Sequence, residues 1–406
     1  MIHDSHFVVY TNVSFMKKPA NGQNKPKNIE TSGLRTWIEV DRAAIAENYK
    51  TFRSLIGPRV KLMAVVKSNA YGHDMWTFTN EIQRLGADWL GVDSIVEALT
   101  LRNRGTTIPI LVLGHVLPER LHEAAARDVS IPISNKEHLK ALAQVKTSKP
   151  LKVHIKVDTG MHRQGFLLSE IPNVVSFVQS KQFKDIAVLE GLFTHFASAK
   201  NPAFPQYTKN QIAEFSQWKK AFEDAGFSFI SHAAATAGTM LFPESHFDMA
   251  RIGIGLYGLW PSIEARAFLK DSITLRPILS WKTVITEIKA VPKGAKIGYD
   301  STETLVRDSL IAVCPVGYWH GYSRKLSSIA RVLVRENYCR VLGRVSMDMI
   351  VIDVTDVAGA KMGDEVVLIG KSGKGEIAFA DMASLDDTSY YETATRLNPL
   401  MKRIYR

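Results

Sequence analysis

The sequence is poor in cysteine and has no long apolar run. Only two of its 406 residues are cysteines, Cys314 and Cys339, so a disulfide framework of the kind found in small secreted domains is excluded. No Cys/His cluster has zinc-site spacing, and we expect no metal ion. No uncharged stretch approaches about 18 apolar residues, and the N-terminus lacks the basic and apolar regions of a signal peptide. We therefore predict a cytoplasmic protein without a membrane partner.

The formal net charge is +11, which could indicate nucleic-acid binding. The basic residues are spread along the chain and no RNA- or DNA-binding motif accompanies them, so we expect no nucleic-acid partner. Residues 1–35 bear many Asn, Lys and Pro residues and predict a mobile extension. The remaining chain is long enough for a barrel of about 250 residues and a second, smaller domain.

After residue 35, short apolar runs alternate with amphipathic stretches. Eight such runs predict an α/β fold, an eight-stranded TIM-type (β/α)8 barrel over residues 36–272. A doubly wound open sheet is the alternative, and only the strand count disfavours it. From 273 to 406, β-rich runs punctuated by glycines predict a mainly β C-terminal domain. The barrel strands are expected at 61–67, 89–94, 109–114, 129–134, 151–158, 189–196, 227–234 and 250–256, with helices at 95–104, 118–127, 136–145 and 209–225.

A lysine ends the first of these apolar runs. Lys67 follows Lys-Leu-Met-Ala-Val-Val and precedes Ser-Asn-Ala-Tyr-Gly, at the mouth of a buried strand. Desolvation lowers the pKa of such an amine below about 10.4, so that it can attack a carbonyl group. On this segment alone, a lysine that merely leaves the strand into solvent is an equal alternative.

Polar residues recur in the strands of the expected barrel. Because side chains alternate along a strand, His154, Lys156 and Asp158 form one row in the barrel lumen, and the row ends at a turn that carries Arg163. A polar core with a purely structural role is the alternative. His195 also ends an apolar strand, where a satisfied core histidine is commoner than a catalyst. Arg251 lies in another apolar strand, so a surface position is improbable for it.

The segment that begins at Gly253 matches the pattern G-x-G-x-x-G. A dinucleotide-binding fold requires a helix to open at this pattern, but Trp-Pro follows at 260 instead, so we reject that interpretation. Exposed backbone N–H groups near Gly253 could still hold a phosphate group.

Several segments, in this order, resemble the alanine racemases, fold-type III enzymes that use pyridoxal 5'-phosphate (PLP). The resemblance covers roughly residues 36–406. Each motif alone has modest specificity for the family, whereas the whole set in this order is highly specific. The motifs are Ala-Val-Val-Lys67-Ser-Asn-Ala-Tyr-Gly-His, Lys156-Val-Asp-Thr-Gly-Met-His-Arg163, Thr194-His-Phe-Ala-Ser, Arg251-Ile-Gly-Ile-Gly-Leu-Tyr-Gly, Ile297-Gly-Tyr299, Pro315-Val-Gly-Tyr and Gly343-Arg-Val-Ser-Met347-Asp.

The resemblance implies that Lys67 carries PLP and serves as a base on one face of the substrate. It also implies that Tyr299 of the other subunit serves the opposite face, in a homodimer with shared active sites, and that strand 36–40 pairs with the β domain. The further implied roles are Arg251 facing the pyridine nitrogen, His195 bracing Arg251 and Tyr299, Arg163 near the PLP phenolic oxygen and the substrate carboxylate, Met347 contacting that carboxylate, Tyr71, Thr236, Gly253 and Ile254 binding phosphate, and Lys156 as a position that can be carbamylated.

Four positions depart from the family pattern. Ala235 precedes Thr236 where the family often has asparagine, so a hydroxyl remains but an amide is lost. Lys200 occupies the place of a frequent entryway aspartate, which makes an ion pair with Arg344 doubtful. His320 replaces an aspartate, and the tyrosine that completes the phosphate site in some members falls at Pro399.

We therefore expect a two-base, PLP-dependent interconversion of L- and D-alanine that supplies D-alanine for peptidoglycan synthesis. A racemase of another or broader amino-acid range on the same scaffold is the nearest alternative, followed by a decarboxylase of this fold type. A non-catalytic PLP-binding protein is a further alternative, but it would have no use for a β domain that carries Tyr299.

Overall fold

The computed structural model describes residues 31–142, 144–147 and 149–406. The extension expected at residues 1–35 therefore lies almost entirely outside the described residues. Contacts divide the chain after Leu34, and Arg35–Arg406 form one unit that holds the barrel and the C-terminal sheet.

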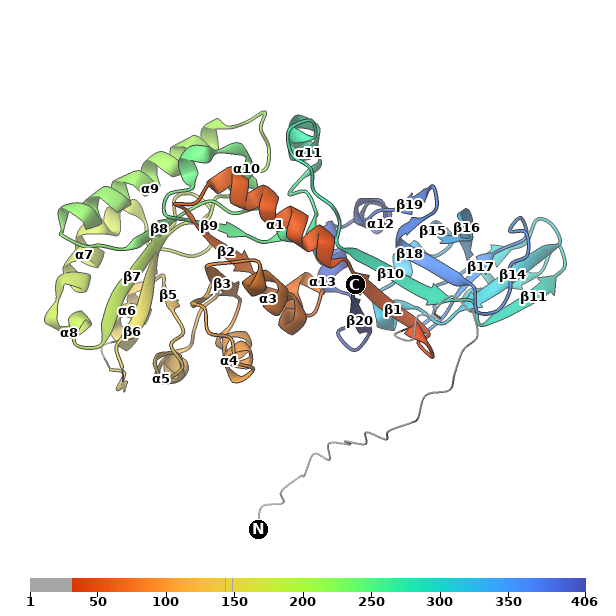
Figure 1. The fold of residues 1–406 in the computed structure, drawn as a ribbon, viewed down its shortest axis with the longest axis horizontal. Helices are drawn as coiled ribbons and strands as arrows, with labels where there is room; N and C mark the ends of the chain where they lie inside the picture. The colour runs from red at the N-terminus through yellow and green to blue at the C-terminus, as the bar shows by residue number, and fades with distance from the viewer. Residues whose placement is uncertain (1–30, 143, 148) are drawn as a thin grey trace, which may run out of the picture. The chain divides into compact units, whose positions relative to one another are not determined.

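Eight parallel strands form a closed barrel (Figure 1). Two four-stranded sheets, ordered β4-β3-β2-β9 and β5-β6-β7-β8, are joined at one edge by the bridge Leu111–Ser130 and at the other by Ala235–Arg251. The predicted TIM-type barrel is thus confirmed, and the closure excludes an open sheet. The strands are β2 (Lys61–Val65), β3 (Trp89–Val92), β4 (Ile110–Val112), β5 (Ile131–Ile133), β6 (Leu151–Lys156), β7 (Ala187–Phe193), β8 (Ile230–His232) and β9 (Met249–Ile252).

The strands are shorter than the sequence pattern predicts, because their last residues leave the ladder and enter the loops at the barrel mouth; β8 also begins three residues later than expected. The expected helices are present as α4 (Ile95–Asn103), α5 (Leu121–Ala126), α6 (Lys136–Leu142) and α9 (Gln206–Asp224). The pattern did not predict the helices near the C-terminus. The remaining helices are α1 (Arg42–Ile56), α2 (Lys67–Tyr71), α3 (Met75–Arg84), α7 (Ile171–Gln179), α8 (Lys181–Lys184), α10 (Thr236–Leu241), α11 (Ile263–Leu269), α12 (Phe379–Leu385) and α13 (Tyr390–Thr395).

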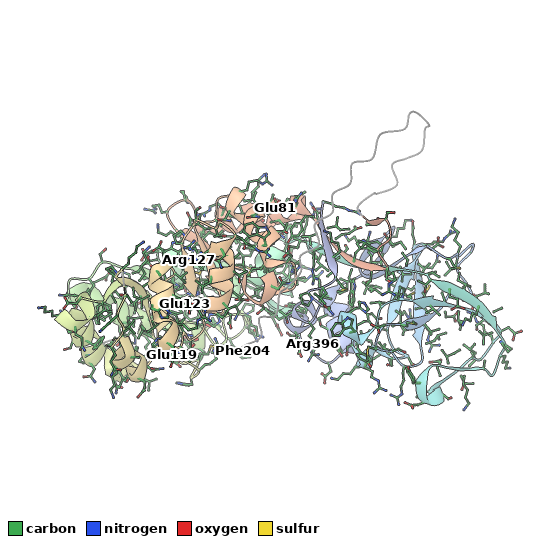
Figure 2. The ribbon with its side chains drawn as sticks, turned by 90° about the horizontal axis from the view of Figure 1, so that it is seen from below. Glu81, Glu119, Glu123, Arg127, Phe204 and Arg396 are labelled. Atoms are coloured by element: carbon green, nitrogen blue, oxygen red, sulfur yellow. The ribbon has the colours of Figure 1, made fainter. Side chains whose placement is uncertain are left out.

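Helix α5 illustrates why these segments are helical. Leu121, Ala124 and Ala125 recur at helical spacing and are buried against the barrel. The charged residues around them lie on the solvent side, where Glu123 and Arg127 are labelled in Figure 2. Burial of this apolar face stabilises a helix that is too short to be stable alone.

The C-terminal part forms a ten-stranded sheet in which the order is β11-β14-β17-β16-β15-β18-β10-β1-β20, with β19 attached to β18. Strand β1 pairs antiparallel with β10 and parallel with β20. A strand that precedes the barrel in the sequence thus lies within a sheet whose other strands all follow the barrel. A separate hairpin joins β12 to β13. The bounds are β1 (Thr36–Val40), β10 (Leu279–Val284), β11 (Glu287–Val291), β12 (Lys296–Ile297), β13 (Glu303–Thr304), β14 (Ser309–Cys314), β15 (Arg331–Val334), β16 (Asn337–Leu342), β17 (Ile350–Asp353), β18 (Glu365–Ser372), β19 (Gly375–Ile377) and β20 (Lys402–Tyr405).

Within the described ranges, no helix is long and apolar enough to cross a membrane. In the same residues, no group of three or more His, Cys, Asp or Glu side chains is placed to hold a metal ion. Cys314 and Cys339 are both buried and carry free thiols.

Asn48 on α1 ties the barrel to the segment that leads into the C-terminal sheet. Its amide nitrogen donates to the carbonyl oxygens of Leu256, at 3.3 Å, and Arg276, at 2.8 Å. Its amide oxygen accepts the N–H of Arg276 at 2.9 Å. Asn48 is only 1% exposed, so water cannot replace these bonds in full.

We predict that Asn48→Leu lowers the free energy of unfolding by about 2–4 kcal/mol, because buried backbone groups lose their partners. Lys50→Leu, at an exposed position of the same helix, is the matched control and should change it by less than about 0.5 kcal/mol. Urea unfolding followed by circular dichroism measures both variants. Equal unfolding midpoints for the two would contradict the assigned role of Asn48.

Candidate functional site

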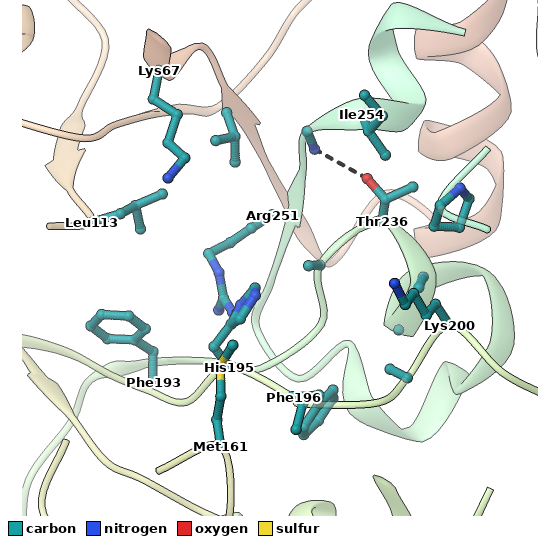
Figure 3. Close-up of a pocket in the computed structure, with 18 of the residues that line it drawn as sticks. Lys67, Leu113, Met161, Phe193, His195, Phe196, Lys200, Thr236, Arg251 and Ile254 are labelled. Carbon is teal, nitrogen blue, oxygen red and sulfur yellow. Dashed lines mark hydrogen bonds between the residues drawn. The ribbon is translucent and has the colours of Figure 1, made fainter. Parts of the chain in front are cut away.

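A cavity of about 540 Å³ opens where the carboxyl ends of the barrel strands meet (Figure 3). Its charged lining is strongly unbalanced, since Asp93 is the only carboxylate-bearing residue among the described residues that line it. A pocket with this excess of positive charge attracts anions. The basic lining residues are Lys67, Lys156, Arg163, Lys200 and Arg251.

Lys67 begins a left-handed turn at the mouth of β2. The next four residues, Ser68 to Tyr71, have φ angles of 54°, 56°, 51° and 52°, a conformation that costs L-residues about 1–2 kcal/mol each. Tertiary contacts hold this strained turn in place. The Ser68 N–H donates to Glu97 at 2.7 Å, the Asn69 side chain accepts the Met75 N–H at 2.9 Å, and the Arg403 guanidinium donates to the Gly72 carbonyl at 2.9 Å.

The Lys67 amine is less desolvated than its apolar sequence context predicts. Strand β2 ends at Val65, so Lys67 belongs to the turn rather than to the buried strand. Its side chain is 36% exposed, and Nζ lies 3.1 Å from Asp93 Oδ1. The amine therefore points into the cavity and is held by a carboxylate.

Thr236 and Gly253 form a cradle of hydroxyl and backbone groups at one side of the cavity. Thr236 Oγ1 accepts the N–H of Gly253 at 3.2 Å (Figure 3) and that of Gly255 at 3.4 Å. A Cβ atom at Gly253 would lie 2.8 Å from the Tyr71 hydroxyl, so glycine is needed for this close approach. Burial, with a contribution from Asp93, raises the pKa of Tyr71 to about 12, and the neutral phenol remains a hydrogen-bond donor. Ile254 lines the same side.

Arg251 lies at the floor of the cavity and is only 3% exposed. It donates to the carbonyl oxygens of Thr194, at 2.7 Å, and Ala233, at 2.8 Å. Burial lowers the pKa of Arg251 to about 9, so that it stays protonated at neutral pH. His195 Nδ1 lies 3.3 Å from the guanidinium. Burial, followed by the charge of Arg251, lowers the pKa of His195 to about 3 and keeps its ring neutral.

Lys156 projects from the end of β6 into the cavity. Its Nζ donates to Gln164 Oε1 at 2.8 Å. Burial, followed by the charges of Arg163 and Arg251, lowers the pKa of Lys156 to about 8. Sequence reasoning missed Gln164 because nothing in its spacing pointed to the lysine.

The polar row expected along β6 is buried, with His154 at 0%, Lys156 at 5% and Asp158 at 6% exposure. Its last member does not face the cavity as a free carboxylate. Asp158 accepts backbone N–H groups at 2.9 to 3.0 Å, including that of Arg163, and so shapes the turn that places Arg163 in the cavity lining.

Two of the expected site residues lie outside the cavity of their own chain. Tyr299 and Met347 belong to the C-terminal part and are 66% and 54% exposed. Arg344 forms an ion pair with Asp300 at 2.7 Å, whereas Lys200 lines the cavity.

The remaining departures also have structural accounts. His320 Nδ1 accepts the Gly317 N–H at 3.2 Å, so the substitution keeps a hydrogen-bond acceptor at this position. Tyr391, rather than Pro399, lines the cavity. Its ring centroid lies 6.4 Å from that of Tyr71. The only sequence signal for Tyr391 was an aromatic pair in an otherwise polar segment, which is too weak to identify a site.

A parallel barrel with a lysine and a cradle of hydroxyl and backbone groups at the carboxyl ends of its strands is typical of enzymes of the TIM-barrel class. The family models for the N-terminal and C-terminal domains of alanine racemase match residues 40–261 and 278–405. The chain belongs to the alanine racemase family.

Individual relatives agree with this assignment. An alanine racemase from Leptospira interrogans is 37% identical over 377 residues, which cover 91% of this chain and 95% of the relative. An alanine racemase from Symbiobacterium thermophilum is 38% identical, and the matched region covers 93% of this chain and 99% of the relative. The crystal structure of Bacillus anthracis alanine racemase with bound L-Ala-P has a TM-score of 0.86 at 35% identity, with coverage of 92% and 95%. Histidine racemase from Leuconostoc mesenteroides subsp. sake has a TM-score of 0.83 at 30% identity, with coverage of 92% and 99%.

The lowered pKa of Lys156 predicts selective reactivity. Because the neutral amine is the nucleophile, acetic anhydride should acetylate Lys156 readily near pH 8 and above, whereas the exposed Lys50 should lag behind. Gln164→Leu removes a group that favours the ammonium form, so the reaction should begin at lower pH in that variant. Peptide mass mapping across a pH series measures both sites. Identical pH profiles for Lys156 and Lys50 would contradict the prediction.

Proposed function

We propose that this protein interconverts L- and D-alanine with PLP as its cofactor. The observation that carries the proposal is the arrangement in one cavity of a lysine amine, a cradle suited to an anionic group and a buried arginine, contributed by Lys67, Thr236 with Gly253, and Arg251. The similar proteins, most of which are alanine racemases, support the same activity.

The residues present fit PLP in charge and in hydrogen-bonding chemistry. The Thr236 hydroxyl and the backbone near Gly253 and Ile254 suit a phosphate group, and the neutral Tyr71 phenol adds a donor. The Lys67 amine provides the point of covalent attachment. Bound PLP supplies an electron sink that labilises the Cα–H bond of an attached amino acid.

Each remaining residue has a defined task in this proposal. Lys67 takes and returns the α-proton on one face of the substrate, and Tyr299 of a second copy does so on the other face. Arg251 faces the cofactor ring nitrogen with a permanent charge, which withholds a proton from that nitrogen and limits side reactions. Neutral His195 orients Arg251, and Arg163 holds the substrate carboxylate.

A homodimer follows from the position of the second base. Tyr299 and Met347 are exposed and lie outside their own chain's cavity, so a second copy has to bring them to the substrate. In this proposal the Met347 N–H contacts the substrate carboxylate. We place the enzyme in the cytoplasm, where D-alanine would be made for peptidoglycan.

We further propose that Lys156 can be carbamylated. The ammonium group first loses one proton, the neutral amine then attacks CO₂ to form a C–N bond as one C–O π bond opens, and a second proton leaves the nitrogen, so that the cation becomes an anion. A negative charge there would pair with Arg163, which shares the cavity lining. The hydrogen bond to Gln164 favours the unmodified ammonium and competes with the reaction.

A broader amino-acid range is the second candidate function. One of the similar structures is a histidine racemase, and Lys200 places a cation in the lining of the cavity. A chiral chromatographic assay across an amino-acid panel decides between the candidates, with Lys67→Ala as the inactive control. We expect alanine to be the best substrate of the parent enzyme. Faster turnover of another amino acid would overturn the alanine assignment, and no turnover of any would overturn racemisation.

The two bases can be separated by isotope exchange. Tyr299→Phe should retain PLP and still exchange the α-proton of D-alanine with solvent, because the Lys67 face is intact. Net racemisation should fall by about 10²- to 10⁴-fold, the usual effect of losing a general acid or base. Deuterium incorporation is measured separately from each enantiomer. Equal loss of exchange from both would show that Tyr299 is not the second base.

A further inference from the structure

A line of buried side chains runs from Arg251 down the barrel lumen to Glu190. Arg251 Nη1 lies 2.8 Å from His232 Nδ1. His232 Nε2 lies 2.9 Å from His154 Nδ1, and His154 Nε2 lies 3.2 Å from Glu190 Oε2. The two histidines are 0% exposed, whereas the Glu190 side chain is 18% exposed. The line therefore connects the floor of the cavity to the other end of the barrel.

The chemistry of the two ends sets the direction of every bond in this line. A guanidinium can only donate, so His232 accepts at Nδ1 and must carry its proton on Nε2. That proton is donated to His154 Nδ1, which leaves the His154 proton on Nε2. An ionised carboxylate can only accept, and Glu190 accepts this last proton. Both histidines are thereby assigned the same tautomer, and no bond in the line is left without a donor.

The local sequence makes room for the line. Val153 of β6 pairs with Leu189 of β7, but His154 pairs with Gly191, so the register skips Glu190. A Cβ atom at residue 191 would lie 2.1 Å from His154 Nδ1. Glycine at 191 is therefore required for the imidazole to occupy the lumen, and the skip brings Glu190 within reach of that ring.

The charges along the line are consistent with its direction. Burial by itself raises the pKa of Glu190, but the hydrogen bond and the charge of His154, the hydrogen bond from Ser130 and the charge of Lys152 outweigh it and leave the pKa lowered. Burial, followed by the charge of Arg251, holds the pKa of His232 well below its usual value. A cation and an anion thus lie at the two ends of the line.

The walls around the line contain few other charges. Trp89 packs edge-on against His154 with ring centroids 5.5 Å apart, and Phe193 stacks on His232 at 4.8 Å. At the outer end, Lys152 Nζ lies 3.8 Å from Glu190 and 2.7 Å from Asp128. Asp128 thus shares the lysine with Glu190, although within the described residues no hydrogen bond joins it to the histidines.

We propose that Glu190 is a positioning residue that fixes the tautomers of His154 and His232 and, through them, supplies the counter-charge of Arg251. Its effect reaches the cavity floor without contact with substrate or cofactor. The consequence for turnover rests on the proposed function, whereas the tautomers are a property of the protein itself.

The direct test compares Glu190→Gln with Asp128→Asn. Each removes one carboxylate beside Lys152, but only the first replaces the acceptor of His154, a carboxylate that can only accept, by an amide that can accept or donate. Nitrogen NMR of ¹⁵N-histidine-labelled enzyme distinguishes the protonated from the unprotonated ring nitrogen. We expect a single Nε2–H tautomer for His154 and His232 in the parent and in Asp128→Asn, and mixed tautomers in Glu190→Gln. Unchanged tautomers in Glu190→Gln would overturn the proposal.

A second readout is the pH profile of kcat/KM for alanine. Loss of the Glu190 charge lowers the pKa values of the titrating groups beside Arg251. The acidic limb of the profile should therefore move to lower pH by about half a unit, as expected for one charge acting across an interior with an effective dielectric constant of about 20. Asp128→Asn should move it much less, because the Asp128 side chain is 62% exposed and water screens its charge. Equal profiles for both variants would also overturn the proposal.

Milder variants keep the test decisive if Glu190→Gln does not fold. Ser130→Ala removes one of the hydrogen bonds that lower the pKa of Glu190. Glu190 should therefore be protonated at a higher pH in this variant, and on acidification the Nε2–H tautomers should be lost earlier than in the parent enzyme. Glu190→Asp retains the charge and should restore them in part. Unchanged acid titration in Ser130→Ala would overturn the proposal. An inactive parent enzyme would instead overturn the proposed function, while the tautomers remained measurable.

Discussion

Arg251 places a permanent positive charge inside a closed barrel, where an uncompensated ion would be very unfavourable. Its guanidinium is held by the carbonyl oxygens of Thr194 and Ala233 and by the rings of His195 and His232. Burial, followed by this charge, lowers the pKa of both histidines and keeps their rings neutral. It also helps to make the cavity selective for anions, together with the lysines that line it. The polar interior of the barrel is therefore organised around one buried cation.

The position of Lys67 depends on a different constraint, the left-handed turn after β2. Its backbone is unfavourable for the residues that form it. Distant parts of the unit hold it in place, among them Glu97 on α4 and Arg403 on β20. The C-terminal sheet thus supports the conformation of a segment at the barrel mouth. This dependence links the stability of the sheet to the position of Lys67 and Tyr71.

Most of the architecture and much of the site could be predicted from the sequence. The eight barrel strands are confirmed, because each is a short apolar run and such runs have few other stable arrangements. Strand ends and the helices α12 and α13 could not be placed, since both depend on what packs against them. The basic residues expected at the barrel mouth do line one cavity, whereas Gln164 and Tyr391 had no signal in spacing or composition.

The sequence by itself determined the fold class, because alternating apolar runs and ordered motifs are local properties of the chain. It also placed Lys67, Lys156, Arg163 and Arg251 near the ends or within the apolar runs of the barrel. Only the tertiary structure decided that Lys67 pairs with Asp93 and that Glu190 reaches Arg251 through two histidines. Those contacts join different strands or the loops that follow them, and their distances depend on barrel closure and on a register skip that no local pattern encodes.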